Sequence, residues 1–198
     1  PYLLPHVVRR LKRELPRLKL MLYEHQTAPL LEKLSAGEID MGILALPVPL
    51  DGLEAEPLYD EPFTLAVPAG HRLADQERVR VEDLKGETLL LLEDGHCLRD
   101  QALEVCSRIR VQEEQDYRAT SLETLRQMVA AGHGVTLMPQ LAAESPVGGA
   151  RGMRTKTFVR PVPTRTIGAV WRKSTTRTQA IAATANTIRA AMKEESKR

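Results

Sequence analysis

Residues 88–106, TLLLLEDGHCLRDQALEVC, contain an apolar run, a turn and a segment with helical spacing. The run at 88–92 predicts a buried strand, and the Asp94-Gly95 pair is a turn signal. Cys97 therefore falls at or near the start of a helix. Both cysteines of the 198-residue chain, Cys97 and Cys106, lie in this stretch. A strand followed by a helix is the repeating unit of α/β folds.

A similar unit occurs twice more, as a weak internal repeat. In the first copy, strands at 18–23 and 39–46 flank a helix with Thr27 as N-cap, and in the second Thr120 is the N-cap before a strand at 135–138. Repeated βα units predict parallel sheets with helices on both faces, and two copies favour two subdomains. We place subdomain I at residues 1–67 plus 168–198, and subdomain II at 68–167.

The remaining elements follow from apolar periodicity and from breakers such as Pro16. We expect helices at 4–15, 82–85 and 175–195, strands at 63–67, 117–119 and 166–171, and a loop at 139–152.

Composition limits the possible functions. The formal net charge is only +2, which argues against a broad basic surface that binds nucleic acid by itself. No apolar run is long enough to cross a bilayer and the first residues do not follow signal-peptide order, so we expect a cytoplasmic protein without membrane contact. No metal site or cofactor is expected, because the cysteines form no CxxC pair and the five histidines are scattered.

The spacing of the two cysteines suggests a switch. Free N–H groups and the dipole at a helix start favour the thiolate of Cys97, with Arg99 and a protonated His96 as nearby cations. Cys106 lies nine residues further on, about 13 Å along a helix, whereas a disulfide needs Cα atoms within about 7 Å. Oxidation and the helix would then exclude each other. The alternative is that both are inert buried thiols, the usual state of free cysteine.

The amino-acid sequence of this segment resembles that of a known family. Residues 95–102, GHCLRDQA, with Cys106 after them, closely resemble the sensor segment of the peroxide-sensing LysR-type transcriptional regulators. Residues 118–125 (RATSLETL), 129–132 (VAAG) and 165–168 (RTIG) look like other stretches of the same proteins. The resemblance implies an α/β regulatory domain of two Rossmann-like subdomains, similar to a type II periplasmic-binding-protein fold.

The resemblance also implies roles for single residues. Cys97 would be the peroxidatic sensor, oxidised by hydrogen peroxide to a sulfenic acid, and Cys106 the resolving thiol that forms a Cys97–Cys106 disulfide and remodels the helix between them. His96 and Arg99 would stabilise the thiolate and steer the leaving oxygen. Two further residues complete the implied site: Asp100, which would orient Arg99 or a water, and Thr27, which would help to hold peroxide.

The partners implied by the resemblance are those of a transcription factor. They are a homodimer or homotetramer, DNA through an N-terminal winged helix-turn-helix outside this sequence, RNA polymerase, and a thiol reductant of the glutaredoxin or thioredoxin type. Three other interpretations remain: an ordinary small-anion effector domain of the LysR type with incidental cysteines, a thiol peroxidase, and a periplasmic binding protein. The sensor interpretation predicts a peroxide-reactive thiol and no turnover enzyme.

Overall fold

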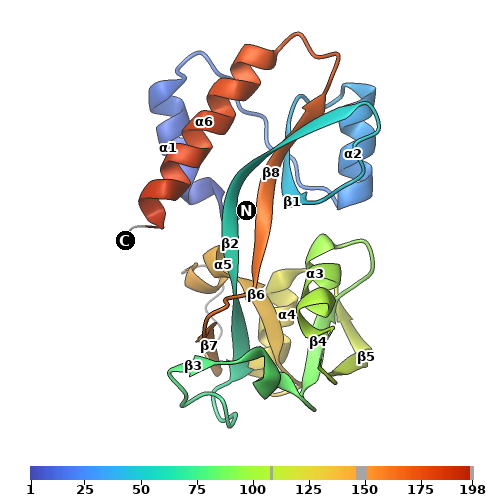
Figure 1. The fold of residues 1–198 in the computed structure, drawn as a ribbon, viewed down its shortest axis with the longest axis vertical. Helices are drawn as coiled ribbons and strands as arrows, with labels where there is room; N and C mark the ends of the chain where they lie inside the picture. Colours follow the sequence, from blue (N-terminus) through green and yellow to red (C-terminus); the bar gives the residue numbers. More distant parts are fainter. Residues whose placement is uncertain (108, 146–150, 197–198) are drawn as a thin grey trace. The chain divides into compact units, whose positions relative to one another are not determined.

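The computed structural model describes residues 1–107, 109–145 and 151–196 (Figure 1). The chain divides into two compact units: unit 1, Pro1–Asp60 with Arg165–Arg198, and unit 2, Glu61–Thr164. The divisions predicted from the sequence are at 67/68 and 167/168. Strand β2 (Leu53–Pro68) explains the first difference, because it is one continuous strand that contributes residues to both units. Pro68 marks the end of this strand and not the boundary of a unit.

Unit 1 contains a sheet in which β8 (Thr164–Arg172) lies between β1 (Gly42–Leu46) and the first part of β2. The β1–β8 pair is antiparallel, with Gly42 opposite Val170. The sequence predicts parallel pairing here, and for this pair the prediction is wrong. Parallel neighbours need a crossover connection between them. β8 instead enters unit 1 when the chain returns from unit 2, and it runs against β1.

Three helices belong to unit 1: α1 (Leu4–Glu14), α2 (Thr27–Ala36) and α6 (Thr178–Glu195). Helices α1 and α6 pack against each other, as Figure 1 shows. Helix α2 supplies Leu34 to a buried cluster with Leu44, Leu53 and Val170. Thr27 is the first residue of α2, not its predicted N-cap, which is Gln26 without a capping side-chain hydrogen bond.

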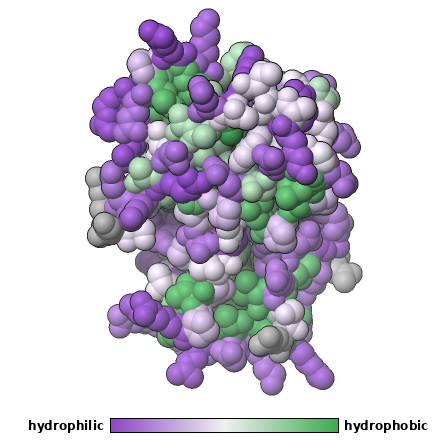
Figure 2. Space-filling view, turned by 45° about the horizontal axis from the view of Figure 1, so that its top comes forward, coloured by the Kyte–Doolittle hydropathy of each residue, from purple (hydrophilic) through white to green (hydrophobic). Residues whose placement is uncertain are grey.

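The strand predicted at 18–23 is wrong. The residues between α1 and α2 belong to no strand, and three of their apolar side chains are exposed: Met21 by 76%, Leu22 by 56% and Tyr23 by 61%. The composition of this segment favours a strand, but a strand also needs a backbone partner. None of the strands that the structure describes pairs with it. In the space-filling view of Figure 2, hydrophobic residues are green and hydrophilic residues are purple.

Unit 2 contains the second part of β2, which pairs antiparallel with both β6 (Thr136–Pro139) and β7 (Met153–Phe158). The short β3 (Arg78–Val79) pairs parallel with β7. A separate sheet consists of β4 (Thr88–Leu92) and β5 (Gln112–Ala119), which are parallel and are connected through a helix, as the sequence predicts.

The helical elements of unit 2 are η1 (Val81–Leu84), α3 (Cys97–Cys106), α4 (Leu122–Ala130) and α5 (Gln140–Glu144). The N-cap of α4 is Ser121, whose hydroxyl accepts a hydrogen bond from the Thr124 amide at 3.2 Å, and not the predicted Thr120. Helix α5 occupies part of the predicted 139–152 loop, of which 146–150 lie outside the described residues. Within the described ranges, no helix is both long and apolar enough to cross a bilayer.

Candidate redox site

Helix α3 carries one cysteine at each end. Cys97 is its first residue, after His96 as N-cap, and Cys106 is its last. The turn before it depends on Gly95, whose φ of +93° is favourable only for glycine. The helix start predicted from the Asp94-Gly95 turn is therefore confirmed. Cys106 is nine positions after Cys97 on this continuous helix, which corresponds to about 13 Å of rise and about two and a half turns.

The two thiols lie in different environments. Cys97 is partly exposed, whereas Cys106 is only 2% exposed. Burial raises the pKa of Cys106 to about 11, because an apolar surrounding disfavours the thiolate. Only the thiolate is a strong nucleophile. Cys106 is therefore a neutral, shielded thiol at physiological pH, and Cys97 is the thiol that an oxidant can reach.

Four charged side chains form a closed ring beside the start of α3, which we call the charge ring. Arg99 of α3 donates from Nε to Asp94 Oδ1 at 2.9 Å and from Nη2 to Glu113 Oε1 at 2.8 Å. Arg118 completes the ring, with Nη1 2.8 Å from Asp94 Oδ2 and Nη2 3.5 Å from Glu113 Oε1. The ring contains two positive and two negative charges, so it is neutral, and it attaches α3 to β5.

The pairing of β4 with β5 explains how this ring assembles. Glu113 lies opposite Leu89 and Arg118 opposite Leu91, so four residues of β5 correspond to Leu90 alone. Two positions on a strand that are two residues apart lie about 7 Å from each other. Glu113 and Arg118 are five residues apart in sequence, and this wide bulge brings both within reach of Arg99.

Arg99 has a further feature. Its side chain is 10% exposed, and Nη1 is buried without a hydrogen-bond partner in the described part of the chain. A buried guanidinium N–H without a partner is costly. One donor of this guanidinium is therefore buried and unused in the described structure.

The other predicted site residues have different surroundings. His96 is partly buried, with Nε2 3.8 Å from Glu93 Oε1. Asp100 is exposed, and the side-chain hydrogen bonds of Arg99 go to Asp94 and Glu113 instead. Thr27 lies in unit 1, in the first turn of α2.

Sequence reasoning missed three members of the charge ring, Asp94, Glu113 and Arg118, as functional residues. The sequence marks Asp94 only as a turn residue. The β5 residues appear in the sequence among other charges, and no spacing rule marks them. The bulge that joins them depends on the register between β4 and β5, which local sequence does not determine.

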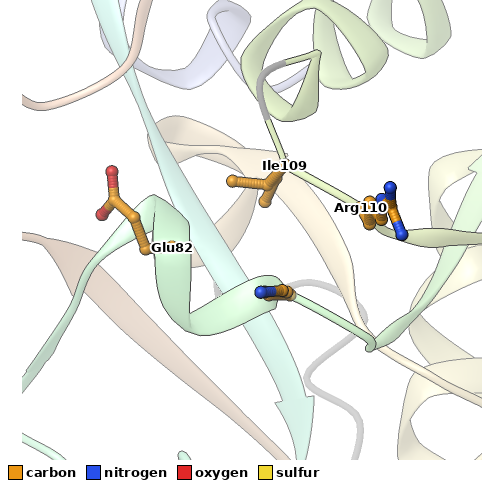
Figure 3. A pocket seen from close by; sticks show the side chains of 4 residues that line it. Glu82, Ile109 and Arg110 are labelled. Atoms are coloured by element: carbon orange, nitrogen blue, oxygen red, sulfur yellow. The ribbon is translucent and has the colours of Figure 1, made fainter.

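An open pocket of about 600 Å³ lies where the chain leaves α3 (Figure 3). It is lined by Glu82, Lys85, Ile109 and Arg110. The Ile109 amide donates to the Cys106 carbonyl at 3.0 Å, and the Gly86 amide donates to the Arg110 carbonyl at 2.7 Å. Backbone hydrogen bonds thus connect residues 109–110, which follow α3, to the end of α3 and to Gly86, which follows η1. Among the described residues, no group of three His, Cys, Asp or Glu side chains could hold a metal ion.

Comparison with known proteins assigns the family. The LysR substrate binding domain matches residues 1–193, and the chain belongs to this family. Within the family it is homologous to OxyR. It is 48% identical to the DNA-binding transcriptional dual regulator OxyR of Escherichia coli K12 over 172 residues, 87% of this chain and 56% of the relative. It is 45% identical to a probable hydrogen peroxide-inducible genes activator of Mycobacterium avium over 179 residues, 89% of this chain and 57% of that protein.

Solved structures agree with this assignment. The reduced form of OxyR matches with a TM-score of 0.86 at 44% identity, covering 97% of this chain and 90% of that one. The oxidized form matches with a TM-score of 0.86 at 45% identity, covering 98% and 91%. The fold predicted from the resemblance is thereby confirmed as a LysR substrate-binding domain. The chain spans 56% of the length of the E. coli relative.

Proposed function

We propose that this chain is the peroxide-sensing regulatory domain of a transcription regulator, and that its signal is a Cys97–Cys106 disulfide. The observation that carries the proposal is the position of the two cysteines, at opposite ends of one continuous helix and in unequal environments. Relatives named as hydrogen peroxide-inducible genes activators support the choice of oxidant.

The reaction has two steps. The thiolate sulfur of Cys97 attacks one oxygen of hydrogen peroxide, the O–O bond breaks, and hydroxide leaves, so that Cys97 becomes a sulfenic acid. The Cys106 sulfur then attacks the Cys97 sulfur, the S–O bond breaks, and the Cys106 proton leaves with the oxygen as water. In total, two thiols are oxidised to one disulfide, and one peroxide is reduced to two waters.

Neighbouring residues would assist the first step. Free N–H groups at the start of α3 favour negative charge on the Cys97 sulfur. Arg99 would stabilise the leaving oxygen, with His96 as a second donor. Asp100 would act through an ordered water, and the role expected of Thr27 in holding peroxide stays a prediction.

The second step requires a change of fold. A disulfide needs Cα atoms within about 7 Å, roughly half of the separation that α3 imposes. Helix α3 must therefore unwind. Because Arg99 belongs to α3 and its acceptors do not, the charge ring opens in the same event. Ile109, whose amide donates to the Cys106 carbonyl, would move with the end of α3.

The remodelled surface would change how subunits pack in a dimer or tetramer. DNA binding through an N-terminal winged helix-turn-helix, contact with RNA polymerase, and re-reduction by a glutaredoxin or thioredoxin type of protein would follow in a bacterial cytoplasm. The domain acts as a stoichiometric sensor and not as a turnover enzyme.

Mass spectrometry after one equivalent of hydrogen peroxide tests this function. We expect the wild type to lose two hydrogens and to yield a peptide linked through Cys97 and Cys106. Cys106→Ser should instead retain a sulfenic acid that dimedone traps, and Cys97→Ser should not react.

Other outcomes would assign another function. If both cysteines stay reduced while a small anion raises the melting temperature, the chain is an ordinary effector domain. If the chain consumes many equivalents of peroxide in the presence of a reductant, it is a thiol peroxidase.

A further inference from the structure

Positive charge is concentrated in one short segment of unit 1. Residues 9–19, RRLKRELPRLK, contain six of the chain's 28 lysine and arginine residues but only one of its 26 aspartate and glutamate residues. This segment therefore carries a formal charge of +5, and the rest of the chain carries −3. The net charge of +2 is thus unevenly distributed, and a strongly basic stretch lies within a chain that is otherwise slightly acidic.

The packing of α1 determines which of these cations are exposed. One side of the helix buries Val7 and Leu11. A second side faces α6, against which α1 packs (Figure 1), and there Arg10 Nη1 lies 2.7 Å from Glu194 Oε1. The remaining side of α1 contacts neither the core nor α6, so its side chains point into solvent.

This remaining side carries three exposed cations at the spacing i, i+3 and i+4: Arg9, Lys12 and Arg13. Two more, Arg17 and Lys19, are exposed shortly after the end of α1. We call these five residues the basic segment. Among the described residues, an acidic partner is present for only one of the five, at 3.3 Å between the guanidinium of Arg13 and the carboxylate of Glu14.

The basic segment does not help unit 1 to fold. Arg9 and Arg13 are like charges at i, i+4, an arrangement that destabilises a helix. A negatively charged partner would remove this repulsion. A row of exposed cations matches the closely spaced phosphates of a nucleic acid, which lysine and arginine neutralise with release of counterions.

The side chains of the segment also indicate which part of a nucleic acid it fits. Single-stranded bases stack on aromatic side chains, and amide side chains take part in reading adenine. Residues 9–19 contain neither kind. Three of the five exposed cations are arginines, whose planar guanidinium donates two parallel hydrogen bonds to a phosphate. This chemistry fits the phosphate backbone of a duplex and not the bases.

We propose that the basic segment of unit 1 binds the phosphate backbone of duplex DNA without sequence preference. The choice of DNA rests on the proposed function, because a transcription regulator works beside a duplex. The contact itself involves neither cysteine. With about four phosphates neutralised, binding is weak and decreases with salt, with a slope of about −3 to −4 in log Kobs against log salt concentration. In a longer polypeptide this contact adds to the affinity of a sequence-specific domain.

Fluorescence anisotropy of a labelled duplex of mixed sequence, titrated with this 198-residue chain at about 50 mM salt, tests the proposal. The triple variant Arg9→Gln/Lys12→Gln/Arg17→Gln should bind at least tenfold more weakly and with a salt slope smaller by about 3. These three side chains are exposed and form no ion pair with a described residue, so the variant should retain the circular dichroism and the melting temperature of the wild type.

A matched control separates the segment from net charge. Arg151→Gln/Arg154→Gln/Arg160→Gln removes three exposed arginines of unit 2, lowers the net charge by the same amount, and should bind DNA like the wild type. Equal weakening in both triple variants would overturn the proposal, as would a wild type without salt-dependent binding. Poly-L-glutamate that binds more tightly than the duplex would assign the segment to an acidic protein partner and overturn it too.

A further variant keeps this proposal apart from the redox function. Cys97→Ser should bind the duplex like the wild type, because the basic segment lies in unit 1 and the cysteines in unit 2. If peroxide forms the Cys97–Cys106 disulfide while the wild type does not bind DNA, the present proposal fails and the proposed function stands. If DNA binds while both cysteines stay reduced, the reverse holds.

Discussion

At the scale of single residues, two identical side chains acquire different chemistry from their positions on one helix. Cys97 lies at the start of α3 and is accessible, whereas Cys106 faces the interior of unit 2. The order of events follows from this difference. In the mechanism we propose, Cys97 reacts first, and Cys106 reacts only after α3 has opened.

The buried Cys106 thiol makes stability depend on pH. Its pKa is raised by burial from 9.0 to about 11, so between these values the unfolded chain releases a proton that the folded chain keeps. The free energy of unfolding should therefore fall as pH rises from 9 to 11, by at most about 1.4 kcal/mol per pH unit from this group. Urea unfolding under reducing conditions at pH 8, 9 and 10 measures it.

Cys106→Ala should lose this part of the pH dependence, and Cys97→Ala should retain the part that Cys106 contributes. If wild type and Cys106→Ala lose stability in parallel over this range, the burial of Cys106 does not act as described.

At the scale of elements, the charge ring connects the start of α3 to β5, and in the proposed mechanism it would stabilise the dithiol form. In Arg99→Gln the helical form loses its ion pairs, while the bridged form, in which the ring is already open, loses little. The disulfide should become harder to reduce. We expect the reduction potential to become more negative on the order of 30 mV, which corresponds to about 1.4 kcal/mol. Equilibration with glutathione buffers measures the shift.

Two controls distinguish this effect from a general loss of charge. Arg118→Gln removes a ring member outside α3 and should shift the potential less than Arg99→Gln. Arg72→Gln removes an ion pair with Glu87, away from α3, and should not shift it. An equal shift in all three variants would show that the ring has no specific role.

The elements also show what sequence can predict. The strand 88–92, the turn at Gly95 and the helix from Cys97 were predictable because each depends on local signals. The prediction of a strand at 18–23 was wrong. This segment has the composition of a strand, but no strand of the described sheets pairs with it. The N-cap of α4 lies one residue after the predicted Thr120, since Thr120 and Ser121 both suit the position. The N-cap of α2 lies one residue before the predicted Thr27. The charge ring depends on the β4–β5 register, which is a long-range property.

At the scale of the whole molecule, both cysteines and the charge ring lie within unit 2. We therefore expect the direct effect of oxidation on backbone protection to concentrate in α3, the start of β5 and residues 109–110. Helix α6 and strand β1 of unit 1 should keep their protection, because neither contains a residue that has to move. Amide exchange mapped over the whole chain before and after one equivalent of peroxide measures this distribution.

Uniform loss of protection in both units would indicate global destabilisation and not a local switch. The Cys97→Ser variant treated with the same amount of peroxide is the control and should retain its protection throughout.

The most direct test of the account is a backbone NMR comparison of residues 98–105 in the dithiol and disulfide forms. Helical chemical shifts should be present in the reduced protein, disappear when the Cys97–Cys106 bond forms, and return after reduction. Cys106→Ser should keep them after the same treatment. A disulfide form that retains continuous helical shifts from Cys97 to Cys106 would contradict the central claim that bridging and this helix exclude each other.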